Sequence, residues 1–224
     1  MARRLKRKFN FLRFLFLLLG IGIIGASCML AATVFASIKD LRTISPGVLE
    51  TSVPTTIYDK DGNLITSLGL KNSVPVSLSM VPEHVKNAFL AIEDPTFYKH
   101  HGISIRGILR AAWTDLIAGE IVEGGSTITQ QLVKISFLTP EQTVKRKIQE
   151  IIIALQLERH YPKDQILEMY LNTIYLGEGA YGVQAAAQTY FGKDVSELTL
   201  AEGALLAGLT QAPSAYNPYK IYNL

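Results

Sequence analysis

The hydrophobic pattern separates one uninterrupted apolar segment from a longer region in which apolar positions recur with helical spacing. Residues 14–38 read FLFLLLGIGIIGASCMLAATVFASI and contain no charged side chain. Because an apolar helix of about 20 residues crosses the hydrocarbon core of a bilayer, we predict a transmembrane signal-anchor here. A cleaved signal peptide is the alternative, and its apolar core is usually about 7 to 15 residues long.

A turn signal follows the apolar segment. Residues 55–69 read TTIYDKDGNLITSLG, with apolar positions on both sides of Asp61-Gly62-Asn63. Such a trio between apolar runs is typical of a β-hairpin turn. We therefore expect residues 39–75 to form a linker that carries a small β-hairpin.

Helical spacing follows the linker. Pro82 fits a first-turn position, and Val85, Phe89 and Ile92 follow at i, i+4 and i+7 of one helix face. The sequence shows no alternating strand pattern after residue 80. We therefore expect a mainly α-helical domain over residues 76–224.

The longest of these helices is predicted over residues 139–160, TPEQTVKRKIQEIIIALQLERH. Thr139, with Pro140 after it and Gln142 at the third helical position, has the pattern of a capping box. The predicted apolar face consists of Val144, Ile148, Ile151 and Leu155. Three further helices are expected: one that ends near Gly177, one closed by Gly192, and one that begins with a capping box of Thr199 and Glu202.

The net charge of +3 is distributed unevenly. The first 13 residues carry six basic side chains and no acidic one, which leaves 16 basic and 19 acidic residues for the rest. Basic flanks stay cytoplasmic, so residues 1–13 are predicted to be a cytoplasmic tail and the body to lie outside. The mildly acidic body argues against nucleic acid as its partner. Cys28 is the only cysteine, so no intrachain disulfide can form.

The first candidate for chemistry is the stretch AIEDPTFYKHHGIS. Pro95 disfavours helix for Asp94, so the preceding helix should end near Glu93. The helix dipole disfavours the charged form of a carboxylate at that end. A carboxylate that readily takes up a proton suits a general acid or base. The alternative is a solvated helix end, with His100 and His101 on the surface.

The second candidate is KRKIQE within the predicted long helix. Arg146 lies four residues and Lys147 three residues before Glu150, so the three side chains share a helix face. Two cations beside a carboxylate could bind a pyrophosphate, with or without a divalent metal ion. The alternative is a surface helix stabilised by ion pairs.

The third candidate is EGGSTITQQLVK. It lacks the Gly-Lys-Ser/Thr ending of a P-loop, but a helix capped by Ser126 or Thr127 would begin here. Its N-terminus could bind an anion, and Thr127, Gln131 and Lys134 would share one face. A plain capped helix is the alternative. The adjoining face, which we expect to pack in the core, carries Ile128, Leu132 and Ile135.

Five stretches in order resemble the peptidoglycan glycosyltransferases of glycosyltransferase family 51. This family forms the N-terminal catalytic domain of class A penicillin-binding proteins and also occurs as monofunctional enzymes. The resemblance runs from residue 53 to the C-terminus. The stretches are Glu93-Asp94 with Phe97, His100 and Gly102, then GGSTITQQLVK, RKIQE, ILEMYLNTIYLG and GVQAAAQTYFGK.

The resemblance implies a lysozyme-like helical fold with a small membrane-associated subdomain. It implies polymerisation of lipid II, an undecaprenyl-pyrophosphoryl disaccharide-pentapeptide, into β-1,4 glycan strands with inversion at the anomeric carbon. The implied partners are lipid II, the growing lipid-linked strand, the membrane, and proteins of cell-wall synthesis or division. A divalent ion, Mg²⁺ or Mn²⁺, near Glu150 is allowed but not required.

The resemblance also assigns roles by position. Glu93 matches the family's catalytic base, which acts on the acceptor 4-hydroxyl, and Glu150 matches its second essential glutamate. Lys134, Arg146 and Lys147 match the cations that hold pyrophosphate. The full set of matched substrate-binding residues is Ser126, Thr127, Gln131, Lys134, Arg146, Lys147 and Tyr175.

The sequence departs from class A penicillin-binding proteins in one respect. Their transpeptidase domain carries an S-x-x-K motif, and this sequence has none. Because the chain stops at APSAYNPYKIYNL, we expect either a truncated glycosyltransferase domain or a short monofunctional enzyme. Two rival readings are a lysozyme-like glycan hydrolase, which would not need the cations, and a non-catalytic membrane-anchored scaffold of the same fold.

Overall fold

The computed structural model describes residues 11–39, 55–62, 64–68, 72–119, 124–139, 141 and 143–221. The protein is mainly α-helical, as expected. In chain order its elements are α1 (Phe11–Lys39), β1 (Thr55–Tyr58), β2 (Leu64–Leu68), β3 (Asn72–Ser73), η1 (Leu78–Met80), α2 (Glu83–Glu93), η2 (Phe97–Lys99), α3 (Ile105–Ala118), α4 (Ile128–Phe137), α5 (Val144–His160), α6 (Lys163–Thr173), β4 (Ala180–Tyr181), α7 (Val183–Phe191), η3 (Val195–Glu197), α8 (Leu200–Leu209) and α9 (Pro218–Ile221).

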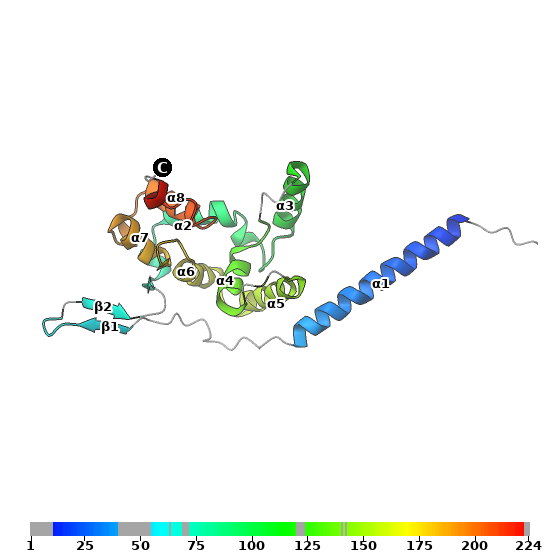
Figure 1. Ribbon diagram of the computed structural model, residues 1–224, viewed down its shortest axis with the longest axis horizontal. Helices are drawn as coiled ribbons and strands as arrows, with labels where there is room; N and C mark the ends of the chain where they lie inside the picture. Colours follow the sequence, from blue (N-terminus) through cyan, green and yellow to red (C-terminus); the bar gives the residue numbers. More distant parts are fainter. Residues whose placement is uncertain are drawn as a thin grey trace, which may run out of the picture.

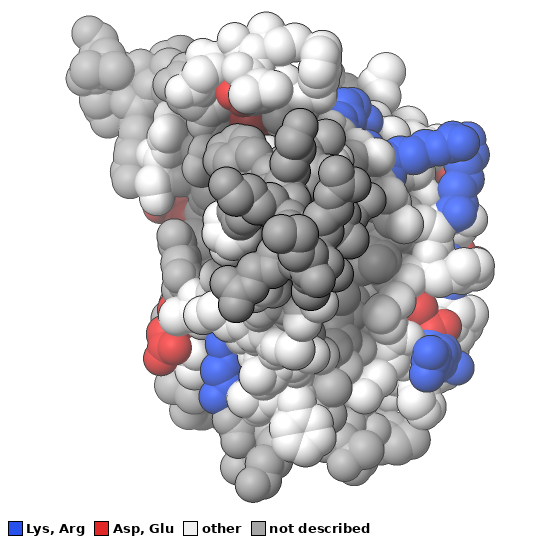
Figure 2. Space-filling model, turned by 90° about the vertical axis from the view of Figure 1, so that its right-hand side faces the viewer, with Lys and Arg blue, Asp and Glu red and all other residues white. Residues whose placement is uncertain are grey.

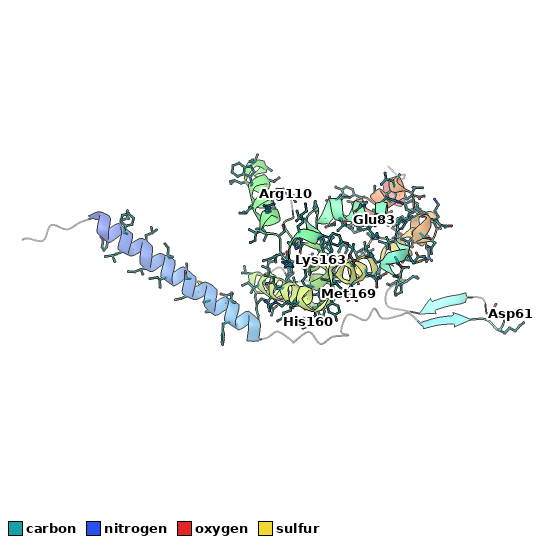
Figure 3. All side chains as sticks on the ribbon, turned by 180° about the vertical axis from the view of Figure 1, so that it is seen from behind. Asp61, Glu83, Arg110, His160, Lys163 and Met169 are labelled. Atoms are coloured by element: carbon teal, nitrogen blue, oxygen red, sulfur yellow. The ribbon has the colours of Figure 1, made fainter. Side chains whose placement is uncertain are left out.

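Two elements project from a body of packed helices (Figure 1). One is α1, whose unburied apolar span Phe14–Ala36 is long enough to cross a membrane. The other is the predicted hairpin, which is confirmed: β1 pairs antiparallel with β2, with Thr55 opposite Leu68. Asp61 lies at the tip of this hairpin (Figure 3).

Helix α4 lies against both α5 and α6, and α2 packs on α8. The predicted core face of α4 is largely confirmed, because Ile128 and Leu132 are fully buried and Ile135 is half-buried. Other predicted boundaries also hold. Helix α2 ends at Glu93, Gly192 closes α7 in the left-handed conformation, and Thr199 with Glu202 forms a capping box on α8.

The predicted start of the longest helix is wrong. Helix α5 begins at Val144, and the side chain of Thr143 caps it by accepting a hydrogen bond from the backbone N–H three residues on. Thr139 therefore lies outside the helix, while Pro140 and Gln142 lie outside the described residues. Thr143 caps the helix with the same hydroxyl chemistry that was expected of Thr139. The predicted N-cap therefore lies one helical turn too early.

The predicted apolar face of α5 is also wrong. Val144 is exposed, and Ile148, Ile151 and Leu155 are only half-buried. Apolar residues occur around the whole circumference of this helix from Ile148 to Leu157, so periodicity could not select the inward face. Glu150, which the apolar pattern excluded from the core, lies on that face. The buried residues of α5 are Glu150, Ile153, Ala154 and Leu157.

A strand after residue 80, the two-residue β4, was not expected, and it takes part in a parallel pairing. β3 pairs with β4, with Asn72 opposite Ala180, and two residues per strand are too few to show an alternating pattern. The side chain of Asn172 secures this region, because it accepts from Val76 N at 2.9 Å and donates to Val76 O at 2.8 Å. Helix α6 ends at Thr173, before the predicted Gly177.

Candidate active site

Glu93 lies at the last position of α2 and is held by two uncharged donors. The Gln131 side chain donates to Glu93 Oε2 at 2.5 Å, and the Thr210 hydroxyl donates to Glu93 Oε1. The hydroxyl of Tyr170 donates to Gln131 Oε1 at 3.3 Å and so holds the other end of the amide. Burial and the Glu93 charge raise the pKa of Tyr170 well above its usual value, which keeps the phenol protonated as this donor.

Asp94, the next residue, joins the end of α2 to the start of α4. Its buried carboxylate accepts from His100 Nε2 at 2.8 Å and from the backbone N–H of Ile128 at 3.2 Å. Because Ile128 is the first residue of α4, this contact sets the distance between the two helix ends. It thereby brings Glu93 opposite Gln131.

The glycine-rich stretch is a capped helix start, as expected. Thr127 and Gln130 form a capping box, and the Thr127 hydroxyl donates to Gly102 O at 2.6 Å. Gly125 approaches α3 closely, since a Cβ there would lie 3.1 Å from the Cα of Ile108. The glycine is therefore needed for the contact between this loop and α3.

Glu150 is buried on α5 and is held mainly by cations. Arg146 donates to Glu150 Oε2 at 2.8 Å, and Lys147 donates to Glu150 Oε1. Gln130 adds a neutral donor to Oε1 at 3.1 Å. Lys147 also reaches Ser126 Oγ at 2.7 Å, which connects this ion cluster to the glycine-rich loop.

A single pocket brings Glu93 and the glycine-rich loop together. Arg106 and Arg110 of α3 also line it, and Arg110 is labelled on that helix in Figure 3. The pocket thus places a carboxylate, a capped helix start and two guanidinium groups around one space. The residues that line it are Glu93, Asp94, Pro95, Thr96, Ser104, Arg106, Gly107, Arg110, Gly124, Gly125, Ser126 and Thr127.

The two glutamates have opposite electrostatic surroundings. Glu93 accepts only from neutral donors among the described residues, so its charge is oriented but not neutralised. Glu150 is neutralised by Arg146 and Lys147. Two carboxylates in unlike environments take unlike roles. Glu93 can therefore accept a proton, whereas Glu150 holds Arg146 and Lys147 in position.

The surroundings of Glu150 do not fit a divalent metal ion. Both of its oxygens already accept hydrogen bonds from cationic side chains, and Mg²⁺ would need oxygen ligands in place of them. Within the described ranges, no group of three His, Cys, Asp or Glu side chains could hold an ion. We therefore assign no step to a metal.

Five of the seven predicted binding residues do not line this pocket, and Lys134 and Tyr175 are among them. Lys134 is exposed on α4, one turn after Gln131 and on the same helix face as that residue, which is the hydrogen-bond partner of Glu93. Tyr175 pairs with Tyr181 at a ring-centroid separation of 4.9 Å and lines no part of the pocket. The structure thus groups Glu93, Ser126, Thr127 and Gln131 closely, and joins Glu150, Arg146 and Lys147 to them through Ser126.

Helix α3 presents a long apolar face to solvent. In Figure 2, the described part of the surface is mostly free of Lys, Arg, Asp and Glu, which appear as a few separate groups. Because α3 also lines the pocket, an apolar surface adjoins the candidate site. Its exposed apolar residues are Ile105, Ile108, Leu109, Trp113, Leu116 and Ile117.

Sequence reasoning missed several residues of the site. The spacing of Thr127 and Gln130 fits a capping box and could have drawn attention to Gln130, the partner of Glu150. Arg106 and Arg110 are four residues apart, which could have indicated one helix face. Thr210 lies 117 positions from Glu93, so only the packing of α8 on α2 reveals their contact.

The chain is similar to known bacterial proteins over most of its length. Residues 61–223 match the family described as Transglycosylase. Penicillin-binding protein 1F of Bacillus subtilis (strain 168) is 52% identical over 162 residues, which cover 72% of this chain and 23% of that protein. Penicillin-binding protein 1A of Escherichia coli (strain K12) is 50% identical over 183 residues, which cover 82% of this chain and 21% of that protein.

A crystal structure of penicillin-binding protein 1A from Haemophilus influenzae is 34% identical, with a TM-score of 0.39, and covers 76% of this chain and 16% of that chain. The chain therefore spans less than a quarter of the length of these relatives, at 16% to 23%. The resemblance to peptidoglycan glycosyltransferases is confirmed by the family match, which covers most of the sequence. The chain belongs to the transglycosylase family.

Proposed function

We propose that this chain is a membrane-anchored peptidoglycan glycosyltransferase that polymerises lipid II. The product would be a β-1,4 glycan strand, made with inversion at the anomeric carbon and with release of undecaprenyl pyrophosphate. The observation that carries this proposal is the contrast between Glu93, oriented by neutral donors, and Glu150, neutralised by two cations. The family membership supports the reaction class.

The chemistry requires one base and several cations. A sugar hydroxyl is a poor nucleophile near neutral pH, so Glu93 takes the proton of the acceptor 4-hydroxyl as its oxygen attacks the donor's anomeric carbon. The bond from that carbon to the pyrophosphate breaks, and its electron pair stays on the phosphate oxygen. Lys134, Arg146 and Lys147 stabilise the leaving charge, as preorganised cations do in transition states.

The membrane anchor suits substrates that carry lipid tails. The apolar span of α1 provides a single crossing, and the basic residues before it favour a cytoplasmic N-terminus. The exposed apolar face of α3 would rest on the outer leaflet beside the site. We therefore place the catalytic body on the extracytoplasmic side of the cell membrane.

The direct test is to incubate the purified full chain with lipid II in detergent and to separate the products by size. We expect glycan polymer, together with undecaprenyl pyrophosphate. Digestion by a muramidase then verifies the β-1,4 linkage. A folded, membrane-inserted chain that forms no polymer under any divalent-ion condition would contradict the proposal.

Loss of a pyrophosphate-binding cation is expected to weaken substrate binding. Lys134→Ala and Arg146→Ala should each reduce the affinity for a pyrophosphoryl-lipid ligand by roughly tenfold or more, because a charged hydrogen bond contributes about 1.5 to 3 kcal/mol. Binding is measured by fluorescence anisotropy of a labelled ligand. Lys193→Ala is the matched control, since Lys193 pairs with Glu202 away from the site. Unchanged affinity in both variants would contradict the proposed role of Lys134 and Arg146 in binding the pyrophosphate.

A further inference from the structure

We propose that Thr210 is a positioning residue for Glu93, and that its hydroxyl serves both the charged and the protonated form of that carboxylate. This inference rests on the proposed role of Glu93 as the base. Thr210 follows the last residue of α8, and its hydroxyl oxygen lies between Glu93 Oε1 and the carbonyl oxygen of Ala207, 2.7 Å away.

The hydroxyl has one proton and two acceptors beside it, so its orientation depends on Glu93. When Glu93 is charged, the hydroxyl donates to it. After Glu93 has taken the proton of the acceptor sugar, its new O–H can donate to Thr210 Oγ1, and the threonine proton turns to Ala207 O. No proton leaves the pair, and each form of the carboxylate keeps a partner.

The other hydrogen-bond partner of Glu93 among the described residues adapts less readily. The Gln131 amide nitrogen that faces Glu93 is a donor only, and the amide oxygen accepts from the Tyr170 hydroxyl. Gln131 could accept from protonated Glu93 only if the whole amide turned over, whereas Thr210 needs only to turn its hydroxyl proton.

The packing of α8 on α2 keeps this hydroxyl in place. Gly203 of α8 lies so close to α2 that a Cβ there would come within 2.9 Å of Val85 Cγ2. The backbone N–H of Thr210 also donates to Ala207 O at 3.3 Å. The threonine is thus fixed by its own helix and by the helix that carries Glu93.

Several charged or titratable groups surround Glu93. Arg106 and Arg110 of α3 line the same pocket, Asp94 follows in the chain and pairs with His100, and Tyr170 of α6 contacts Gln131. A Thr210 substitution leaves all of these in place. A fall in kcat of such a variant therefore reports the lost hydroxyl.

The test is Thr210→Val in the full chain, with the rate of lipid II polymerisation measured over a range of lipid II concentrations. The hydroxyl donates to charged Glu93 and accepts from protonated Glu93, so its loss leaves both forms without this partner. We expect kcat to fall about tenfold with KM nearly unchanged, because Thr210 acts through Glu93. Thr210→Ser, which keeps the hydroxyl, should restore the wild-type kcat.

Thr173→Val is the matched control. The Thr173 hydroxyl donates to Met169 O at 2.6 Å, and the residue is half-buried like Thr210, but it has no contact with Glu93. This variant should retain the wild-type kcat. An unchanged kcat in folded Thr210→Val, or a kcat that Thr210→Ser fails to restore, would overturn the inference. If Glu93→Gln still polymerises, the proposed base itself is wrong, so the two failures are distinguishable.

Discussion

Glu93→Gln is expected to abolish polymerisation of lipid II while the chain remains folded. The amide has nearly the same shape as the carboxylate but cannot accept the proton of the acceptor hydroxyl. A positioned general base contributes about 10²- to 10⁴-fold to a rate, so the residual activity should lie at or below the limit of a gel assay. Affinity for a pyrophosphoryl-lipid ligand should change little, because Glu93 has no assigned contact with phosphate.

Glu83→Gln is the control for this substitution. Glu83 lies in the first turn of the same helix and pairs with Lys86 at the surface, so its loss should leave the rate unchanged. Circular dichroism and thermal unfolding establish that both variants are folded. Wild-type glycan synthesis by Glu93→Gln would contradict the assignment of Glu93 as the base. A loss of rate in Glu83→Gln would show that damage to α2, and not the missing base, causes the effect.

Local signals predicted those parts of the fold that are determined by neighbours in the chain. Thr127 caps α4 because its hydroxyl reaches the N–H of the third helical residue, and both residues are visible in the sequence. Glu93 ends α2 because Pro95 follows it closely. Such contacts join residues a few positions apart, and a single sequence contains the information for them.

Helix α5 shows where local signals were insufficient. Its isoleucines allow more than one inward face, and the face that is buried contains Glu150. A buried carboxylate is costly unless it is paired, and its pairing depends on Gln130 from α4 as well as on its own helix. The orientation of α5 therefore follows from a tertiary ion cluster, which no periodicity of apolar residues reveals.

The candidate site was predicted as a set of residues but not as an arrangement. Position in the family pattern selected Glu93, Gln131 and Glu150 from the sequence. Thr210 carries no motif and contacts Glu93 only because α8 packs on α2. The family resemblance identifies residues that take part in the reaction. The contacts that position those residues, such as that of Thr210 with Glu93, depend on tertiary packing.

Glu150→Gln is expected to reduce polymerisation by roughly 100-fold. It should also lower the stability of the chain, but not by enough to account for the loss of rate. The amide presents one acceptor where the carboxylate presents two, so Arg146 and Lys147 cannot both be held. Removing one member of a buried ion pair costs about 3 kcal/mol, since the partners remain partly buried. We expect a lower Tm and a lower kcat, because misplaced cations stabilise the leaving pyrophosphate poorly.

Glu158→Gln separates the two effects. Glu158 lies on the same helix with its side chain 5% exposed, and it accepts from Lys163 and from Thr129, each at 2.6 Å. Its substitution removes a comparable ion pair and should lower Tm by a similar amount. Because Glu158 neither lines the pocket nor contacts Arg146 or Lys147, kcat measured well below both Tm values should stay near wild type. Equal losses of kcat in the two variants would mean that Glu150 acts through stability alone, and its role in organising the pyrophosphate cations would be wrong.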